Sequence, residues 1–202
     1  MRKIAIAALV ALVVGPVLAQ TPPAGTPTRI RGTVDKLDGQ NLMVKSRDGQ
    51  ALTIELAANV TVITLVRKSI ADIKAGDYVA STGVKGADGK IRAIEVRIFP
   101  EAARGTGEGQ FAWDLMPDSV MTNATVGRVD KAPEGQVLHV TFKGTESEFV
   151  VGPEVPVLAN GPGDISLLKP GVAVFVIALR HGDGKLTSAR LYAEKDGIKP
   201  PM

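Results

Sequence analysis

The sequence predicts an all-β protein made of two similar five-stranded barrels, and three observations support this fold class. Glycine and proline are frequent, with 22 and 13 residues, and they punctuate short runs rich in Val, Ile and Thr. Such runs are typical of short strands joined by tight turns. Three short stretches recur at one constant offset, which indicates an internal repeat. Apolar and polar residues also alternate within each copy, as they do in half-buried strands.

The internal repeat has an offset of 95 residues, since 129 minus 34 is 95. The matching stretches are VDK at 34–36 and 129–131, KAG at 74–76 against KPG at 169–171, and DGK at 88–90 and 183–185. Ile54 falls on Phe149 under the same offset. We therefore interpret the chain as a tandem duplication, with one barrel over residues 29–100 and the other over residues 123–202.

The elements of the first copy follow the order of an OB-fold. The expected strands cover residues 29–37, 41–46, 51–56, 78–85 and 91–99. Asp48-Gly49 and Asp88-Gly89 are hairpin turn signals. Residues 66–73 are weakly helical and stop before Gly76. Three strands, a helical turn and two more strands make a small Greek-key barrel of the OB type, and an SH3-like barrel is the alternative.

Alternation assigns faces to these strands. Leu42 and Val44 share one face of the second strand, since side chains alternate with a period of two. In the second copy, Leu138 and Val140 are expected to point inward, while His139 points outward.

The first residues have the three parts of a secretory signal peptide. Arg2 and Lys3 precede an apolar run over 4–14, and small residues end at Ala19, where we expect cleavage. The run is shorter than the roughly 20 apolar residues that span a bilayer. We therefore expect a periplasmic protein with no integral membrane span, which begins with a Pro-rich segment over residues 20–28.

Composition excludes two classes of protein. The chain has no cysteine, so the exported protein is expected to have no disulfide bond and no lipid anchor on cysteine. Without Arg2 and Lys3 the 24 basic residues fall to 22 against 21 acidic ones, and no basic stripe is visible. Nucleic-acid binding requires such a stripe, so we expect no nucleic-acid partner.

Residues 101–122 join the two copies and match nothing else in the chain. This connector holds the only tryptophan, Trp113, among several other large apolar residues. Because a flexible linker lacks such side chains, we expect the connector to pack against both barrels, with Arg104 paired to Glu108 or Asp114. The alternative is an exposed recognition patch. In either case the candidate binding residues are Arg104, Glu108, Phe111, Trp113, Asp114, Met116 and Met121.

Metal binding and catalysis have weaker support. The two histidines, His139 and His181, fall on different elements, so no metal site or other cofactor is predicted. A minor alternative is copper handling through Met116 and Met121, with His139 or Met43 as a further ligand, because soft thioether ligands select Cu(I).

An enzyme would have to use the carboxylates of the connector. Glu108, Asp114 and Asp118 could form a glycosidase pair beside Trp113. The aspartates are more typical of turn caps, and no nucleophile motif is present. We expect no enzyme.

Three stretches resemble a known family. They are IADIKAGDYV at 70–79, DGKIRAIEV at 88–96 and the segment from Arg104 to Val126. They are similar to secreted bacterial repeat proteins of domain-of-unknown-function family 5666, and the third stretch resembles a proteobacterial subgroup often labelled metal ABC transporter permease. The resemblance implies an exported protein with OB-like units and no established activity. A permease needs several spanning segments, which this sequence lacks after residue 19. We expect a binding or scaffolding protein of the cell envelope, with an unknown envelope protein or small ligand as partner.

Overall fold

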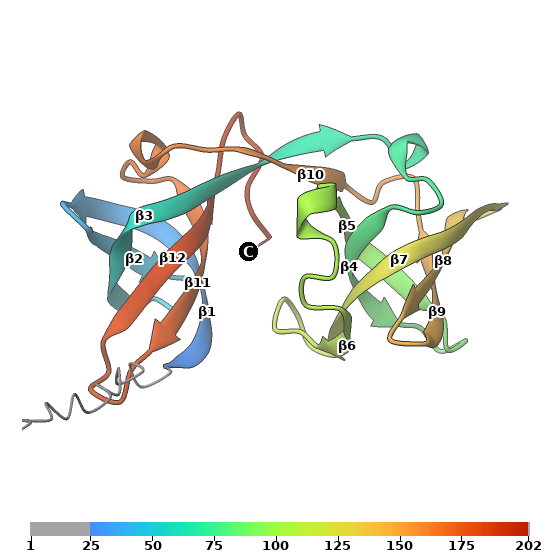
Figure 1. Cartoon of the computed structure of the whole chain (residues 1–202), viewed down its shortest axis with the longest axis horizontal. Helices are drawn as coiled ribbons and strands as arrows, with labels where there is room; N and C mark the ends of the chain where they lie inside the picture. The colour runs from blue at the N-terminus through green and yellow to red at the C-terminus, as the bar shows by residue number, and fades with distance from the viewer. Residues whose placement is uncertain (1–24, 202) are drawn as a thin grey trace, which may run out of the picture.

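The computed structural model describes residues 25–201 and consists of two small β-barrels side by side (Figure 1). The all-β, OB-like fold class is confirmed. The expected signal peptide over residues 1–19 lies outside the described residues, as do residues 20–24. None of the helices within residues 25–201 is long and apolar enough to cross a membrane.

Barrel 1 has five strands. They are β1 (Thr26–Asp38), β2 (Asn41–Ser46), β3 (Ala51–Lys68), β11 (Ala173–Arg180) and β12 (Leu186–Ala193). β1 pairs antiparallel with β2 and β11, and β2 pairs antiparallel with β3. The parallel pairing of β12 with β3 closes the barrel. A short 3₁₀ helix, η3 (Ile165–Leu167), precedes β11.

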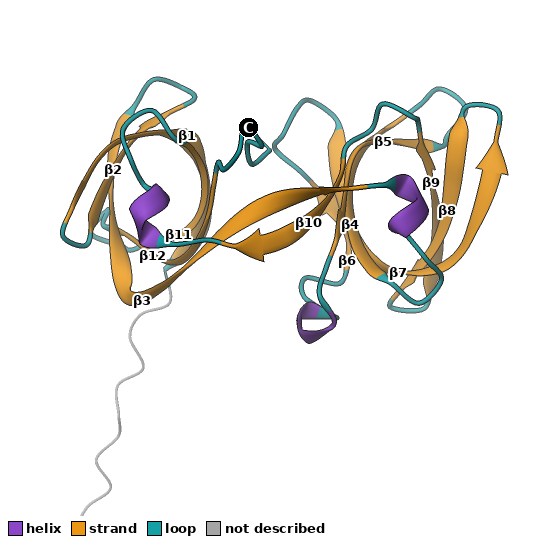
Figure 2. Ribbon diagram, turned by 90° about the horizontal axis from the view of Figure 1, so that it is seen from above, coloured by secondary structure: helices purple, strands orange, loops and turns teal. Residues whose placement is uncertain are grey.

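Barrel 2 repeats this plan. Its strands are β7 (Ser119–Ala132), β8 (Gly135–Phe142), β9 (Thr145–Val151), β4 (Tyr78–Lys85) and β5 (Ile91–Ile98). β7 pairs with β8 and β4, and the parallel pair of β5 with β9 closes the barrel. The helix η1 (Ile70–Asp72) precedes β4, and its first turn is held by a capping box between Ser69 and Asp72. Figure 2 shows one short helix at the open end of each barrel.

Each barrel therefore takes three strands from one half of the chain and two from the other half. β1–β3 close with β11 and β12, whereas β4 and β5 close with β7–β9. The predicted barrels over residues 29–100 and 123–202 are wrong in this respect, because the last two strands of each half are exchanged.

The exchange is made by a long β-ribbon between the barrels. β3 was expected to end near Leu56, but it is 18 residues long and continues to Lys68. There it pairs antiparallel with β10 (Val157–Pro162), which runs back toward barrel 1 (Figure 1). The physical reason is that residues 50–75 contain neither glycine nor proline. The third strand has no turn residue that would fold it back, so it crosses to the other barrel.

Two separate apolar cores fill the barrels. In barrel 1 the fully buried side chains include Leu42, Ile54 and Leu191. In barrel 2 they include Leu138 and Phe149. As predicted, Leu42 and Val44 point inward, and so do Leu138 and Val140. A third cluster of Leu65, Leu158, Phe175 and Tyr192 lies outside both cores.

The strand positions match between barrels, with one change from the predicted alignment. Ile54 opposes Leu42 as Phe149 opposes Leu138, which agrees with the offset of 95. In the first strand, however, the residue equivalent to Val34 is Val126, not Val129. Val34 pairs with Val44 just before a bulge, and Val126 pairs with Val140 just before a bulge.

Several element boundaries also differ from the prediction. β1 begins at Thr26, within the segment expected to precede the barrel, and pairs there with Arg180. β7 begins at Ser119, within the expected connector. The expected helical stretch over residues 66–73 shortens to η1, and Gly76 takes a φ of 93°. Such a positive φ favours glycine, which explains the turn before β4.

Candidate binding site at the barrel junction

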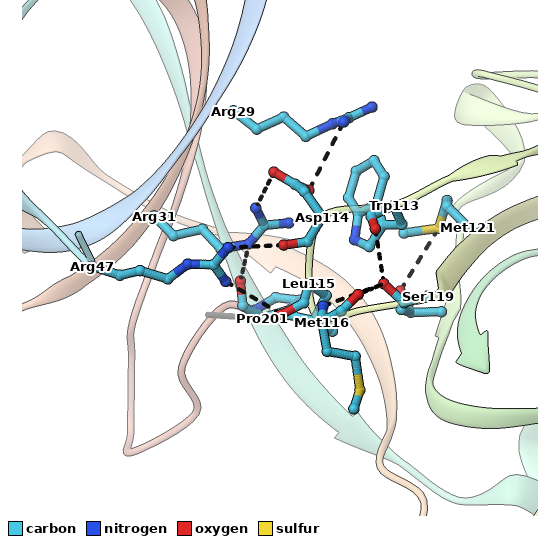
Figure 3. A network of polar contacts seen from close by, with 11 residues as sticks. Arg29, Arg31, Arg47, Trp113, Asp114, Leu115, Met116, Ser119, Met121 and Pro201 are labelled. Carbon is cyan, nitrogen blue, oxygen red and sulfur yellow. Dashed lines mark hydrogen bonds and ion pairs between the residues drawn. The ribbon is translucent and has the colours of Figure 1, made fainter.

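The connector is an ordered part of the structure. After the 3₁₀ helix η2 (Glu101–Ala103), residues Gly109–Ala112 form β6, which pairs with β7 of barrel 2. Residues 113–118 form the loop between β6 and β7, and this loop reaches barrel 1 (Figure 3). We call β6, the loop and residues 119–123 the connector hairpin. The Ser119 hydroxyl holds the loop, since it lies 2.7 Å from the carbonyl oxygen of Met116 and 2.9 Å from that of Trp113.

Asp114 attaches the connector hairpin to barrel 1. Its Oδ2 accepts a hydrogen bond of 2.8 Å from Nη1 of Arg31 on β1, and its Oδ1 lies 3.9 Å from Nη1 of Arg29. Arg47, after β2, donates to the main-chain oxygens of Asp114 and Leu115 at 2.9 and 3.3 Å (Figure 3). Three arginines of barrel 1 therefore hold one short loop that belongs to the sheet of barrel 2.

The electrostatics of Asp114 follow from these contacts. Partial burial acts to raise the pKa of Asp114, but the hydrogen bond from Arg31 and the charges of Arg31 and Arg29 outweigh it, so the pKa lies below its usual value. Asp114 is therefore ionised at neutral pH, which keeps the contact charged on both sides.

Three aromatic rings in contact connect the loop of the connector hairpin with the third apolar cluster. Trp113 packs edge-on against Phe175 at 6.4 Å between ring centroids, and Phe175 stacks on Tyr192 at 6.0 Å. The guanidinium of Arg29 lies 4.0 Å from the centre of the Trp113 ring, and that of Arg97, from barrel 2, lies 4.9 Å from the centre of the Tyr192 ring. Cations over aromatic faces attract the ring quadrupole, so both barrels contribute to this stack.

The C-terminal segment enters the same junction. Ile198 packs against the third apolar cluster. The carbonyl oxygen of Pro201 accepts a hydrogen bond of 3.1 Å from Nε of Arg31. In Figure 1 the C-terminus lies between the two barrels. This contact was not predicted from the sequence, because Ile198 is the one large apolar residue in the short segment 195–201.

On barrel 2 the connector is held mainly by uncharged groups. Asn123 of β7 donates to the main-chain oxygens of Thr106 and Gly107, at 3.2 and 3.0 Å. The Tyr78 hydroxyl also donates to the Thr106 oxygen. Glu108 accepts a hydrogen bond of 2.9 Å from the main-chain nitrogen of Lys143. The expectation that the connector packs against both barrels therefore agrees with its contacts.

The predicted pairing of Arg104 is wrong. Arg104 pairs with Glu101 rather than with Glu108 or Asp114, and it also donates to the main-chain oxygen of Gly76. The reason is local, because η2 places Glu101 and Arg104 three residues apart on one turn, where side chains meet. Glu108 turns instead toward Lys143.

The structure brings together only some of the seven candidate residues. Trp113 and Asp114 meet barrel 1, and Phe111 lies 6.0 Å from Trp113 and is 37% exposed. Met116 points away from the junction and is 46% exposed (Figure 3). Met121 lies on β7, opposite Phe111. Arg104 and Glu108 lie at barrel 2 and belong to a different group of contacts.

The main residues that sequence reasoning missed are the arginines of barrel 1. Arg29 and Arg31 alternate with the inward-facing Ile30, so they lie on the outer face of β1. A pair of arginines two residues apart in a strand was a visible signal, since this spacing places them on one face. Their pairing with Asp114, about 80 residues further along the chain, could not be predicted from this spacing.

A pocket opens beside this contact. It has a volume of about 230 Å³, and β1, the turn after β2 and the end of β11 line it. Its charged lining residues are four arginines and two aspartates: Arg29, Arg31, Arg47, Arg180, Asp48 and Asp114. We call it the arginine pocket. The arginines outnumber the acidic groups by two.

The residues considered for metal binding do not form a common group. Met43 lies on β2 of barrel 1 and Met121 on β7 of barrel 2. His139 lies between Asp130 and Glu148 on the outer face of barrel 2, 2.9 Å from each carboxylate. Within residues 25–201, no group of three or more His, Cys, Asp or Glu side chains is placed to hold a metal ion.

The fold and the junction define a class of protein, namely an all-β protein with two OB-like barrels that share their strands and are joined by a packed connector. Comparison with family models, curated proteins and solved structures finds no match for this chain. The function must therefore be argued from the site itself.

Proposed function

We propose that this is an exported, non-catalytic binding or scaffolding protein of the cell envelope, with its binding site at the barrel junction. The observation that carries this proposal is the concentration of arginine and aromatic side chains there, since Trp, Tyr and Arg are the residues enriched where proteins recognise partners. The proposed envelope location rests on the expected signal peptide over residues 1–19 and on the resemblance to family 5666. The gene duplication inferred from the repeat accounts for two barrels of one plan.

The geometry supports binding rather than catalysis. The carboxylates once considered as a glycosidase pair have other uses, since Asp114 pairs with Arg31 and Glu108 accepts from Lys143. The pKa of Asp114 lies below its usual value because of Arg31, whereas a general acid needs a raised pKa. The connector also contacts both barrels, as a scaffold requires.

Co-purification from crosslinked envelopes tests this function. The wild-type protein is expected to retain a partner or ligand that is lost in Asp114→Ala, because this change releases the loop from barrel 1. The matched control is Glu154→Ala, which removes an exposed carboxylate far along the chain in the turn after β9. The junction is not the site if both variants retain the same partners as the wild type. It is also not the site if neither the wild type nor the variants retain a partner.

Copper handling is a second candidate, and one observation favours it. Met116 is 46% exposed on the loop, so its thioether is accessible to a soft ion. Metal analysis of protein purified from the periplasm tests this candidate. A stoichiometric copper ion that is lost on changing Met116 and Met121 to Leu would support it, and protein without copper would refute it.

A further inference from the structure

The arginine pocket has an excess of positive charge. Arg29, Arg31, Arg47 and Arg180 face only Asp48 and Asp114 across it. Among residues 25–201, Arg47 and Arg180 make no ion pair, and Arg47 contacts only main-chain oxygens of the loop. Four arginines against two aspartates give the pocket a net charge of +2, which favours the binding of an anion.

Arg31 is the most unusual group of the pocket. Its side chain is 3% exposed, and its Nη2 is buried without a hydrogen-bond partner among the described residues. Nε and Nη1 have partners in Pro201 and Asp114. A buried guanidinium nitrogen without an acceptor costs free energy, so Arg31, which lines the pocket, has one donor that the described residues do not use.

Asp114 shows which chemistry the arginines accept. Its carboxylate is the one anion that the chain places against Arg29 and Arg31. Guanidinium groups bind carboxylate and phosphate oxygens through the same planar set of donors. An anion from solution would use the same nitrogens, so it would compete with Asp114 for them.

We propose that the arginine pocket binds a small oxyanion with two negative charges, a phosphate group, in competition with Asp114. The proposal rests on the proposed binding function and gives its ligand class. When an anion takes the place of Asp114, four arginines face Asp48 alone, and this excess of positive charge favours a doubly charged anion over a singly charged one. The volume of about 230 Å³ is below the roughly 300–1,000 Å³ of pockets for drug-sized ligands, so the phosphate is free or carries only a small substituent.

Barrel 2 is the internal control for this site. By the strand register, the positions equivalent to Arg29 and Arg31 are Met121 and Asn123. Asn123 binds the connector through neutral hydrogen bonds. The same fold therefore carries no comparable cation pair on barrel 2, and the arginines are a feature of barrel 1 rather than of the OB-like fold.

Isothermal titration calorimetry of the purified protein tests the proposal, at constant ionic strength and neutral pH. The probes are inorganic phosphate, glycerol 3-phosphate and acetate. We expect saturable binding of a phosphate probe at one site and at least about tenfold weaker binding of acetate, which has one charge. Tighter binding of glycerol 3-phosphate would identify a phosphate ester as the natural ligand, and tighter binding of inorganic phosphate would identify the free ion. Absence of phosphate binding, or acetate binding of equal strength, would overturn the proposal.

Three variants locate the site. Arg29→Gln and Arg180→Gln should each weaken phosphate binding about tenfold or more, since each removes a charged donor. Asp114→Asn should strengthen it about tenfold, because the competing charge is gone. Arg190→Gln, an exposed arginine of β12 outside the pocket, is the matched control and should bind as the wild type does. Equal effects of Arg29→Gln and Arg190→Gln would show non-specific attraction and refute the site.

The proposed phosphate ligand and the proposed binding function can be refuted separately. A protein that binds no phosphate but loses its crosslinked partner in Asp114→Ala would keep the binding function and lose only the proposed ligand. A protein that binds phosphate in the arginine pocket but has no junction-dependent partner would keep the ligand and lose the scaffolding role.

Discussion

The two barrels share one strand order but differ in how they hold the connector. Barrel 2 holds it through main-chain pairing of β6 with β7 and through the neutral side chain of Asn123. Barrel 1 holds it through Asp114 and two arginines of β1. On barrel 2 the charged connector residues Arg104 and Glu108 contact main-chain groups, whereas on barrel 1 Asp114 pairs with charged side chains. The comparison indicates that the fold sets the geometry of the junction, whereas a few outward residues set its chemistry.

The largest expected effect concerns the strand exchange that links the barrels. Cleavage at a protease site inserted between Gly105 and Thr106 should leave two fragments that stay together, because β1 pairs with β11 and β4 pairs with β7 across the cut. Gel filtration should show one peak in native buffer and two peaks in denaturant. Separation in native buffer would mean that each half closes its own barrel.

Core truncation should weaken both barrels together. Phe149→Ala removes the largest fully buried side chain of barrel 2 and should cost about 3–5 kcal/mol of unfolding free energy. Ile54→Ala at the equivalent position of barrel 1 should cost about 2–5 kcal/mol. Because the barrels share strands, denaturant unfolding followed by circular dichroism and by Trp113 fluorescence should give one coincident transition in both variants.

Ile177→Thr is the matched control for these truncations. Its side chain is 42% exposed on β11, so the change should stay within about 0.5 kcal/mol. Two separate transitions in any variant would show that the barrels unfold independently, against the exchanged topology.

Acid should release the connector from barrel 1 and not from barrel 2. Folding lowers the pKa of Asp114, so its ionised form stabilises the folded state above its unfolded pKa of about 3.9. That contribution is lost as the pH falls through the lower folded pKa. With screening by solvent it should be about 1 kcal/mol.

Trp113 fluorescence measures this release, because Trp113 adjoins Asp114 and lies under Arg29. Asp114→Asn should lack the acid transition below about pH 4, the range set by the carboxylate reference pKa, and should have a looser loop at neutral pH. As the comparison, Asn123→Ala should weaken the contact with barrel 2 equally at neutral and acid pH. An unchanged acid transition in Asp114→Asn would assign it to another carboxylate.

The smallest expected effect is at the exposed end of the loop. Met116→Leu should change the unfolding free energy by no more than about 0.5 kcal/mol, because the side chain is 46% exposed and both residues are apolar. Thermal denaturation measures this. A large loss would show that Met116 contributes to the junction, like Trp113.

The strands and turns could be predicted from the sequence because they depend on neighbouring residues. Alternation gave the inward faces of Leu42 and Leu138, and Gly76 marked the turn before β4. The exchange of strands could not be predicted by alternation, since the inward residues of β11 fit a barrel whichever half supplies its partner. The absence of glycine and proline from residues 50–75 was the one local signal of the long β3.

The candidate site was predictable only in part. Trp113 and Asp114 were identified because a linker rarely carries such side chains. Arg31 was not identified, since its burial depends on Trp113, Phe175 and the C-terminal segment, which come together only in the folded protein. Local patterns therefore identified the loop but not the barrel surface that receives it.

The exchanged strands also constrain the order in which the chain can fold. The first three strands of barrel 1 are made early in synthesis, but their partners β11 and β12 come last, from Ala173 onward. Contacts of such long sequence separation form slowly. Until β11 and β12 are made, the edges of β1 and β3 that pair with them have no partner strand. A chain truncated before Ala173 would lack β11 and β12, so barrel 1 would not close. All five strands of barrel 2 would still be present.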